Sequence, residues 1–153
     1  MSARSGDFVL DTSLSCGWCF ADEASAESWA LLERLQGAQA QVTSLWLWKV
    51  GNVLVQAERK GRITPAAIRT FLGILETLPI RIDQVTTATA WHDTLALALA
   101  RSHRLTTYDA AYLELALRLG LPLASRDQAL NAAASKEGVS LLPTGAARHS
   151  HNG

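Results

Sequence analysis

The sequence contains little charge, little cysteine and no long hydrophobic run. Only 18% of its 153 residues are charged, and the 14 basic side chains balance the 14 acidic ones. This balance excludes a nucleic-acid binder that relies on bulk positive charge, although it leaves room for a local basic rim. With only 2 cysteines, the chain cannot contain a disulfide framework. No apolar segment is long enough to cross a bilayer as a helix.

What is present favours a soluble, cytoplasmic, single-domain protein. Residues 1–7 do not have the charged-then-apolar layout of a signal peptide. Hydrophobic residues make up 48% of the chain, which argues against global disorder, and the length suits one domain. We expect that domain over residues 1–145 and a flexible tail over 146–153. The low charge also indicates that a partner covers some of the apolar surface.

Short apolar segments alternate with segments of helical periodicity along the chain. The expected strands cover residues 8–10, 40–43, 80–82, 121–124 and 139–142. The expected helices cover residues 12–20, 24–35, 45–59, 64–77, 87–102, 107–119 and 127–135. This alternation predicts a three-layer α/β domain, with a central, mainly parallel sheet flanked by helices. In such sheets, ligands bind beyond the carboxyl ends of the strands.

Three aspartates stand near these strand ends. Asp11 directly follows the first strand, and Asp127 follows the strand at 121–124. Asp109 lies in the first turn of the preceding helix, which begins at the same sheet edge only if the connection before it allows this. Each acid could also be an ordinary helix cap or first-turn residue. Clustered carboxylates suit metal-assisted phosphodiester cleavage, because Mg²⁺ prefers oxygen ligands and activates bound water.

Four segments resemble the motifs of PIN-domain nucleases, in the family's order, between residues 8 and 142. Phe8-Val9-Leu10-Asp11-Thr12-Ser13 resembles the opening strand, and the segment 43–54 (TSLWLWKVGNVL) is similar to the second motif. The segment 105–116 (LTTYDAAYLELA) resembles the third motif. The segment 121–130 (LPLASRDQAL) resembles the fourth. The third and fourth segments are the most specific.

The resemblance implies a toxin of a toxin–antitoxin pair that cleaves RNA with Mg²⁺ or Mn²⁺. It also implies a cognate antitoxin and a homodimer or a toxin–antitoxin hetero-oligomer. By the same resemblance, Asp11, Asp109 and Asp127 would bind the metal and act in catalysis. Ser13 and Ser125 would line the site and orient the acids or their waters.

Lys49 departs from the family pattern, which has a glutamate at this position. An ammonium group cannot bind Mg²⁺, and it adds positive charge where the metal should lie. Asn52, three positions further along the predicted helix, could offer a neutral oxygen, whereas Glu58 lies too far along the helix. An engineered inactivation, an escape mutation and natural variation would each explain the lysine. We expect Lys49 to pair with one or more of the three aspartates.

This departure leaves two classes of function open. One is an endoribonuclease, inactive as written if Lys49 blocks the metal site. The other is a catalytically inactive PIN-fold binding module that acts only through complexes with its antitoxin and DNA. A manganese-dependent RNA cleavage assay distinguishes the two.

The cysteines and tryptophans give weaker signals. Cys16 and Cys19 form a C-x-x-C motif, but Cys16 falls inside a predicted helix rather than at its start, which favours buried structural thiols. The 5 tryptophans could stack on RNA bases, although core or interface positions are commoner. A partner helix is expected in an apolar groove that the helices at 13–20 and 24–35 form in part. The side chains expected to line that groove are Trp18, Phe20, Trp29 and Leu32.

Overall fold

A sheet of five parallel strands forms the centre of the computed structural model, which describes residues 6–84, 91 and 95–142. The strands are β1 (Phe8–Leu10), β2 (Ala40–Val42), β3 (Ile80–Ile82), β4 (Leu123–Ala124) and β5 (Leu141–Leu142). Their order in the sheet is β3-β2-β1-β4-β5, and every neighbouring pair is parallel. The prediction of a parallel central sheet is confirmed.

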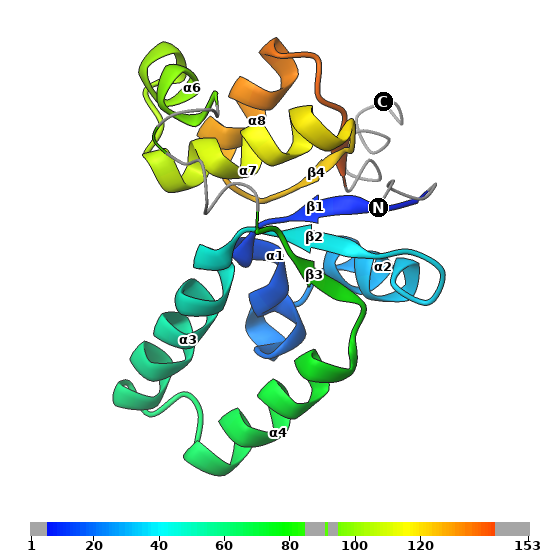
Figure 1. Cartoon of the computed structure of the whole chain (residues 1–153). Coiled ribbons are helices and arrows are strands. Elements are labelled where there is room, and N and C mark those ends of the chain that lie inside the picture. Colours follow the sequence, from blue (N-terminus) through cyan, green and yellow to red (C-terminus); the bar gives the residue numbers. More distant parts are fainter. Residues whose placement is uncertain (1–5, 85–90, 92–94, 143–153) are drawn as a thin grey trace, which may run out of the picture.

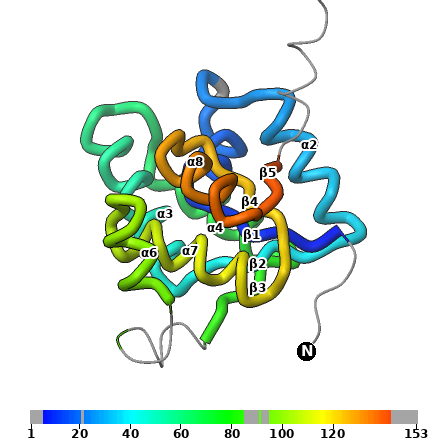
Figure 2. Tube along the Cα trace, turned by 90° about the horizontal axis from the view of Figure 1, so that it is seen from above, coloured from blue at the N-terminus to red at the C-terminus, as the bar shows by residue number. Residues whose placement is uncertain are grey.

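Helices cover both faces of this sheet, which confirms the three-layer architecture (Figure 1). One face carries α1 (Thr12–Ser15), α2 (Ala26–Arg34), α3 (Ser44–Arg59) and α4 (Pro65–Thr77). The other carries α6 (Ala96–His103), α7 (Thr107–Leu119) and α8 (Gln128–Lys136). Figures 1 and 2 both place α3 toward the carboxyl ends of the strands and α2 toward the opposite end of the sheet.

The strand order reverses between β1 and β4. After β1 the chain builds β2 and β3 on one side, and it then crosses to place β4 and β5 on the other. Leu10 pairs with Ala124, so the carboxyl ends of the two strands lie side by side. Such a reversal opens a crevice beyond the carboxyl ends, which is where open α/β sheets bind ligands. Asp11 leaves β1 at this crevice, and Ser125 leaves β4 there.

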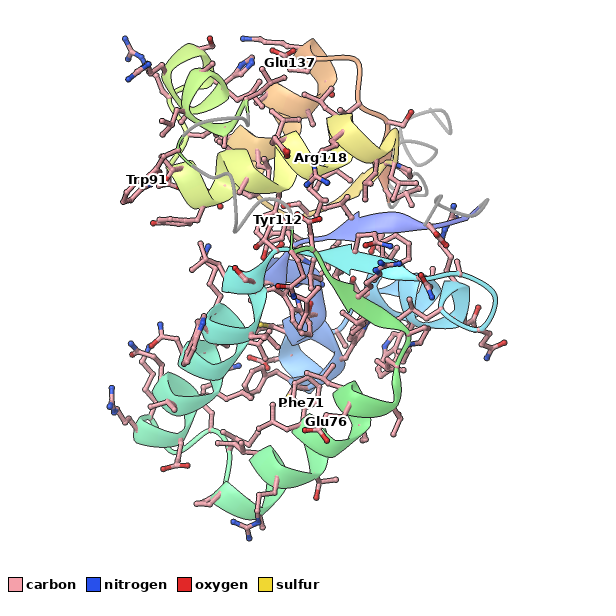
Figure 3. All side chains as sticks on the ribbon, in the orientation of Figure 1. Phe71, Glu76, Trp91, Tyr112, Arg118 and Glu137 are labelled. Atoms are coloured by element: carbon pink, nitrogen blue, oxygen red, sulfur yellow. The ribbon has the colours of Figure 1, made fainter. Side chains whose placement is uncertain are left out.

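The strands at this reversal are buried on both faces. All three residues of β1 are fully buried, as expected for a strand between two layers of helices. Figure 3 shows Tyr112 between α7 and the sheet, and Phe71 on the side of α4 that faces the rest of the domain. Both side chains belong to the hydrophobic core. The hydrophobic core therefore includes side chains from the helices on both sides of the sheet.

The first helix is shorter than the predicted span of 12–20. α1 ends at Ser15, and the chain continues in two 3-10 turns, η1 (Cys16–Trp18) and η2 (Ala21–Glu23). Gly17 packs so closely against α2 that a Cβ atom there would lie 2.9 Å from the Ser28 hydroxyl oxygen. Trp18 also donates a hydrogen bond from Nε1 to the Ser28 carbonyl oxygen, at 2.7 Å. These contacts with α2 explain why the first helix ends early, although the apolar residues continue at helical spacing.

Three predicted strands are also shorter, and parts of two predicted segments fall outside the described residues. β2 ends at Val42 rather than at residue 43. β4 begins at Leu123 rather than at residue 121, because Pro122 has no N–H to donate to the sheet. β5 covers only Leu141–Leu142 of the predicted span 139–142. Of the helix predicted at 87–102, the structure describes α6, which runs from Ala96 to His103; residues 87–90, 92–94 and the predicted tail at 146–153 lie outside the described residues.

The residues predicted to form a partner groove do not leave an open apolar surface. Phe20 is buried, and Trp18 and Leu32 pack against the core, so of the four only Trp29 is largely exposed, at 49%. An apolar pocket of about 250 Å³ instead lies against α3, α4 and β3. It is lined by Trp46, Leu47, Val50, Leu72, Leu75, Glu76, Leu78, Ile80 and Ile82. Across the described part of the chain, no helix has the length and apolar character to span a membrane.

Candidate active site

A cleft of about 780 Å³ opens at the carboxyl edge of the sheet. It is lined by Asp11, Thr12, Ser13, Cys16, Glu23, Trp48, Lys49, Asn52, Val53, Tyr108, Asp109, Arg126 and Asp127. Six of the seven residues that sequence reasoning selected for the site are therefore in its wall. The seventh, Ser125, is buried directly behind it and bonds to Asp11. The three aspartates line this one cleft, as expected from their places in the sequence. The closer approach expected of a shared metal site is not seen among the described residues.

Asp11 is the most enclosed acid of the cleft. Its Oδ1 accepts a hydrogen bond from the Thr12 amide at 2.7 Å, which caps α1. Its Oδ2 accepts from the hydroxyls of Ser125 at 2.7 Å and Ser13 at 3.1 Å. Burial raises the pKa of the Asp11 carboxyl above its ordinary value, and the two serine hydroxyls and the charge of Lys49 only partly offset this. The ionised form is thus held in place at a cost in desolvation.

Asp11→Asn is therefore expected to stabilise the metal-free chain at neutral pH. Between the ordinary pKa of 3.8 and the raised pKa, the folded state binds more protons than the unfolded state. Stability consequently falls as pH rises through that window, and it stays reduced above it. The neutral amide avoids this loss, so we expect a melting temperature about 2–4 °C higher, equivalent to ~1 kcal/mol in a chain of this size.

Thermal melts in EDTA, followed by circular dichroism across a pH series, measure this effect. The gain should shrink as the pH falls through this window, and it should vanish well below 3.8, where the carboxyl is protonated in both states. A variant that melts below the unchanged chain at neutral pH would show that the hydrogen bonds of the carboxylate outweigh its desolvation.

Ser125 and Ser13 link the ends of β1 and β4. Ser125 donates to Asp11 and accepts from the Asp127 amide at 3.0 Å, while Ser13 accepts from the Arg126 amide at 2.9 Å. Asp127 is the N-cap of α8, and its Oδ1 accepts from the Leu130 amide at 2.9 Å. Asp127 is thus the helix cap itself, rather than a first-turn residue after a cap at Ser125. Capping does not exclude a role in the cleft, because the same side chain lines the wall.

Asp109 reaches the cleft because α7 begins at the carboxyl edge of the sheet (Figure 1). Thr106 caps this helix by accepting from the Asp109 amide at 3.2 Å, which leaves the Asp109 carboxylate directed to other partners. Lys49 Nζ lies 3.7 Å from Asp109 Oδ1, and it also lies 4.4 Å from the centroid of the Tyr108 ring. The predicted pairing of Lys49 with an acid of the cleft is confirmed, and Asp109 is the partner.

The acids of the cleft have the oxygen ligands that a hard divalent cation prefers, but they are too far apart to bind one together. Three carboxylates and the Asn52 amide offer only oxygen donors, the type that Mg²⁺ prefers. Within the described ranges, however, no three His, Cys, Asp or Glu side chains are close enough to hold a metal ion. Lys49 contributes a positive charge to the same wall. The donor type fits a metal, whereas the residue at position 49 opposes it.

Sequence reasoning missed several residues of the cleft wall. Trp48 and Tyr108 each directly precede a residue that was selected, and Arg126 lies between Ser125 and Asp127. The Arg126 guanidinium donates to the Glu23 carbonyl oxygen at 2.6 Å and to the Ser25 hydroxyl at 2.9 Å. Their adjacency to the motif positions was the available signal.

The two cysteines are free thiols in an environment that disfavours redox chemistry. Cys16 is buried at the base of the cleft, and burial raises the pKa of its thiol to about 12. Burial also raises the pKa of the Cys19 thiol. A reactive C-x-x-C pair needs a lowered thiol pKa, so both cysteines are better described as structural.

Comparisons with known proteins agree with this geometry. A search of curated proteins gave no match. The crystal structure of PAE2754 from Pyrobaculum aerophilum is similar over 97% of this chain and 92% of its own, with 23% identity and a TM-score of 0.65. A chain of a toxin–antitoxin complex from Klebsiella pneumoniae is similar over 78% of this chain and 86% of its own, with 19% identity and a TM-score of 0.52. At such identities the likeness concerns the fold alone.

The match to a protein family is more specific than these likenesses of fold. The PIN domain matches residues 8–136, from the first residue of β1 to the last residue of α8. This span includes Asp11, Asp109 and Asp127, together with the switch point between β1 and β4. Because the match covers most of the sequence, the chain belongs to the PIN domain family, whose members are generally nucleases.

Proposed function

We propose that this chain is the toxin of a toxin–antitoxin pair, built as a metal-dependent endoribonuclease. The observation that carries the proposal is the shared cleft of Asp11, Asp109 and Asp127 at the switch point of the sheet. Family membership supports nuclease chemistry. The fold shared with a chain of a toxin–antitoxin complex supports an antitoxin as the partner. We further propose residues 1–145 as a single domain.

In this proposal the three aspartates would hold Mg²⁺ or Mn²⁺. When bound, the ion lowers the pKa of a water molecule and neutralises charge on the scissile phosphate of the RNA. The hydroxyls of Ser13 and Ser125 keep the Asp11 carboxylate in one orientation. Ser125 also fixes the start of the loop that carries Asp127. Positioning of this kind determines how well carboxylates act as ligands.

The contact between Lys49 and Asp109 favours a second candidate, a PIN-fold binding module without nuclease activity. The ammonium engages one of the three acids at 3.7 Å and adds a charge that repels a cation. Such a chain would act only by forming complexes with its antitoxin and DNA. The apolar pocket against α3 and α4 is a surface on which a second copy or an antitoxin could assemble. A homodimer or a toxin–antitoxin hetero-oligomer fits either candidate.

Single substitutions of the acids test the nuclease proposal. In a chain that carries Lys49→Glu, each of Asp11→Asn, Asp109→Asn and Asp127→Asn should slow RNA cleavage about 100-fold, as does losing a group that stabilises developing charge. The measurement is cleavage of a labelled RNA with Mn²⁺, and with EDTA as the metal-free arm. Glu58→Gln is a matched control, because Glu58 is an exposed acid of α3 that does not line the cleft.

The control variant and the metal-free arm together show whether cleavage depends on a metal held by the three acids. Glu58→Gln should leave cleavage unchanged, since this carboxylate has no part in the site. Cleavage that persists in all three aspartate variants, or that proceeds equally well in EDTA, would rule out a metal held by these acids.

A further inference from the structure

An exposed tryptophan stands on the rim of the acidic cleft. Trp48 is 76% exposed and lines the cleft together with Tyr108, which is 40% exposed. Exposing an indole to water is unfavourable, since burial of apolar surface stabilises by roughly 25 cal/mol per Å². A ligand that covers this large aromatic face, beside a candidate catalytic site, would therefore bind favourably.

The position of Trp48 on α3 follows from helical geometry. Trp46 lies two residues earlier, about 200° around the helix, and it is buried with its Nε1 donating to the Ser15 hydroxyl at 3.0 Å. Trp48 consequently projects from the opposite side, in the group formed by Lys49, Asn52 and Val53, which also line the cleft. Trp48 therefore does not pack in the core, and its side chain is available for contacts at the surface.

The charges in the cleft offer little attraction to the phosphates of a nucleic acid. Asp11, Asp109 and Asp127 repel them, and the Lys49 ammonium is already engaged with Asp109 and with the Tyr108 ring. The Arg126 guanidinium is held by the Glu23 carbonyl oxygen and the Ser25 hydroxyl. The whole chain has a formal net charge of zero. Within the cleft itself, affinity for a nucleic acid would therefore come largely from contacts to the bases.

We propose that Trp48 is the stacking platform for an unpaired base of a single strand lying across this cleft. The inference rests on the nuclease function proposed above and adds to it a residue of this chain that would bind the substrate. Stacking of a base on an aromatic side chain contributes affinity without reading sequence, because every base presents a π-face. Bases inside a duplex are already stacked on one another, and their faces cannot reach Trp48.

The surroundings of Trp48 favour a nucleic acid over a protein as the ligand. A protein interface has an apolar centre depleted of charge, whereas the cleft that Trp48 lines also includes the polar or charged side chains of Lys49, Asn52, Asp109 and Arg126. Leu47, the exposed apolar neighbour of Trp48, lines the separate pocket against α4. Trp48 also lines the same cleft as the three aspartates that would hold the metal ion.

Binding measured without cleavage tests this assignment. The full chain, unchanged at Lys49, is titrated in EDTA against fluorescently labelled oligouridylate, the matching DNA strand and a duplex of equal length. Trp48→Ala should weaken single-strand binding by about tenfold or more. Trp48→Phe should retain affinity within a few-fold, yet lose the part of the tryptophan fluorescence quenching that belongs to Trp48. Trp29→Ala is the matched control, because Trp29 is exposed on α2, away from α3 (Figure 1).

Separate readouts distinguish failure of this inference from failure of the proposed function. Unchanged single-strand binding by Trp48→Ala, while the Lys49→Glu chain cleaves RNA, would overturn the stacking platform and leave the nuclease intact. Equal losses for single strands and duplex would also overturn it, as would loss of self-association or of antitoxin binding with nucleic-acid binding unchanged. If the chain binds no oligonucleotide and the Lys49→Glu chain cleaves none, both proposals fail. Similar affinities for RNA and DNA strands support stacking, which reads the base rather than the sugar.

Discussion

Lys49→Glu is expected to convert this chain into a metal-binding ribonuclease, with cleavage at least about 100-fold faster than that of the unchanged sequence. The substitution removes the ammonium group 3.7 Å from Asp109 and adds a carboxylate to the wall that the three aspartates share. Both changes act in the same direction on a divalent cation, because a repelling charge is lost and an oxygen ligand is gained. Expression without an antitoxin should then become toxic to the host cell.

Two measurements on purified protein test this result. Calorimetric titration with Mn²⁺ should show binding by the Lys49→Glu chain and weak or absent binding by the unchanged chain. RNA cleavage should follow the same order. The metal-free Lys49→Glu chain should also melt at a lower temperature, since its carboxylates repel one another, and Mn²⁺ should raise that temperature by mass action.

Lys49→Met separates the two effects of the substitution. Methionine removes the positive charge and its contact with Asp109, but it supplies no carboxylate. We expect this variant to remain close to the unchanged chain in cleavage and well below Lys49→Glu. If the unchanged chain binds Mn²⁺ and cleaves RNA as well as Lys49→Glu does, position 49 is not part of the metal site.

Arg118→Met is expected to destabilise the fold by about 3 kcal/mol, because it takes the cation from a buried carboxylate. Arg118 Nε lies 2.8 Å from Glu114 Oε1, and its Nη2 lies 2.8 Å from Asp83 Oδ2. The Glu114 side chain is only 4% exposed, so its charge is poorly solvated once the guanidinium is gone. The residue lies on α7, on the side toward the sheet, and it joins this helix to the segment after β3 (Figure 3).

Urea unfolding followed by circular dichroism measures this loss of stability. Combining Arg118→Met with Glu114→Gln should recover part of it, since the double variant leaves no uncompensated charge at position 114. Arg62→Met is the matched surface control: Arg62 pairs with Asp22 and Glu23 in an exposed position, where solvent screens the charges, and its loss should matter much less. Equal effects of the two single variants would show that burial of Glu114 does not control the energetics.

Several features of this protein could be read from local sequence. Apolar segments of strand length between helical segments gave the parallel sheet, because each strand needs helices on both faces. The placement of Asp11 and Asp127 after strands then put both at one edge, since parallel strands end together. The lysine at position 49 was recognisable as a departure from a motif, and its ionic contact with Asp109 follows from its place on α3.

Contacts between distant segments decided the rest. Ser125 and Asp11 are 114 positions apart, and only the pairing of β1 with β4 brings the serine hydroxyl to the carboxylate, where burial raises the pKa. The direction of α7 placed Asp109 in the cleft, and packing of Gly17 against α2 ended α1 early. Trp46 and Trp48 look alike in the sequence, yet one is buried and the other borders the cleft. Periodicity along a chain indicates that a helix has two faces, but the tertiary packing alone determines what each face meets.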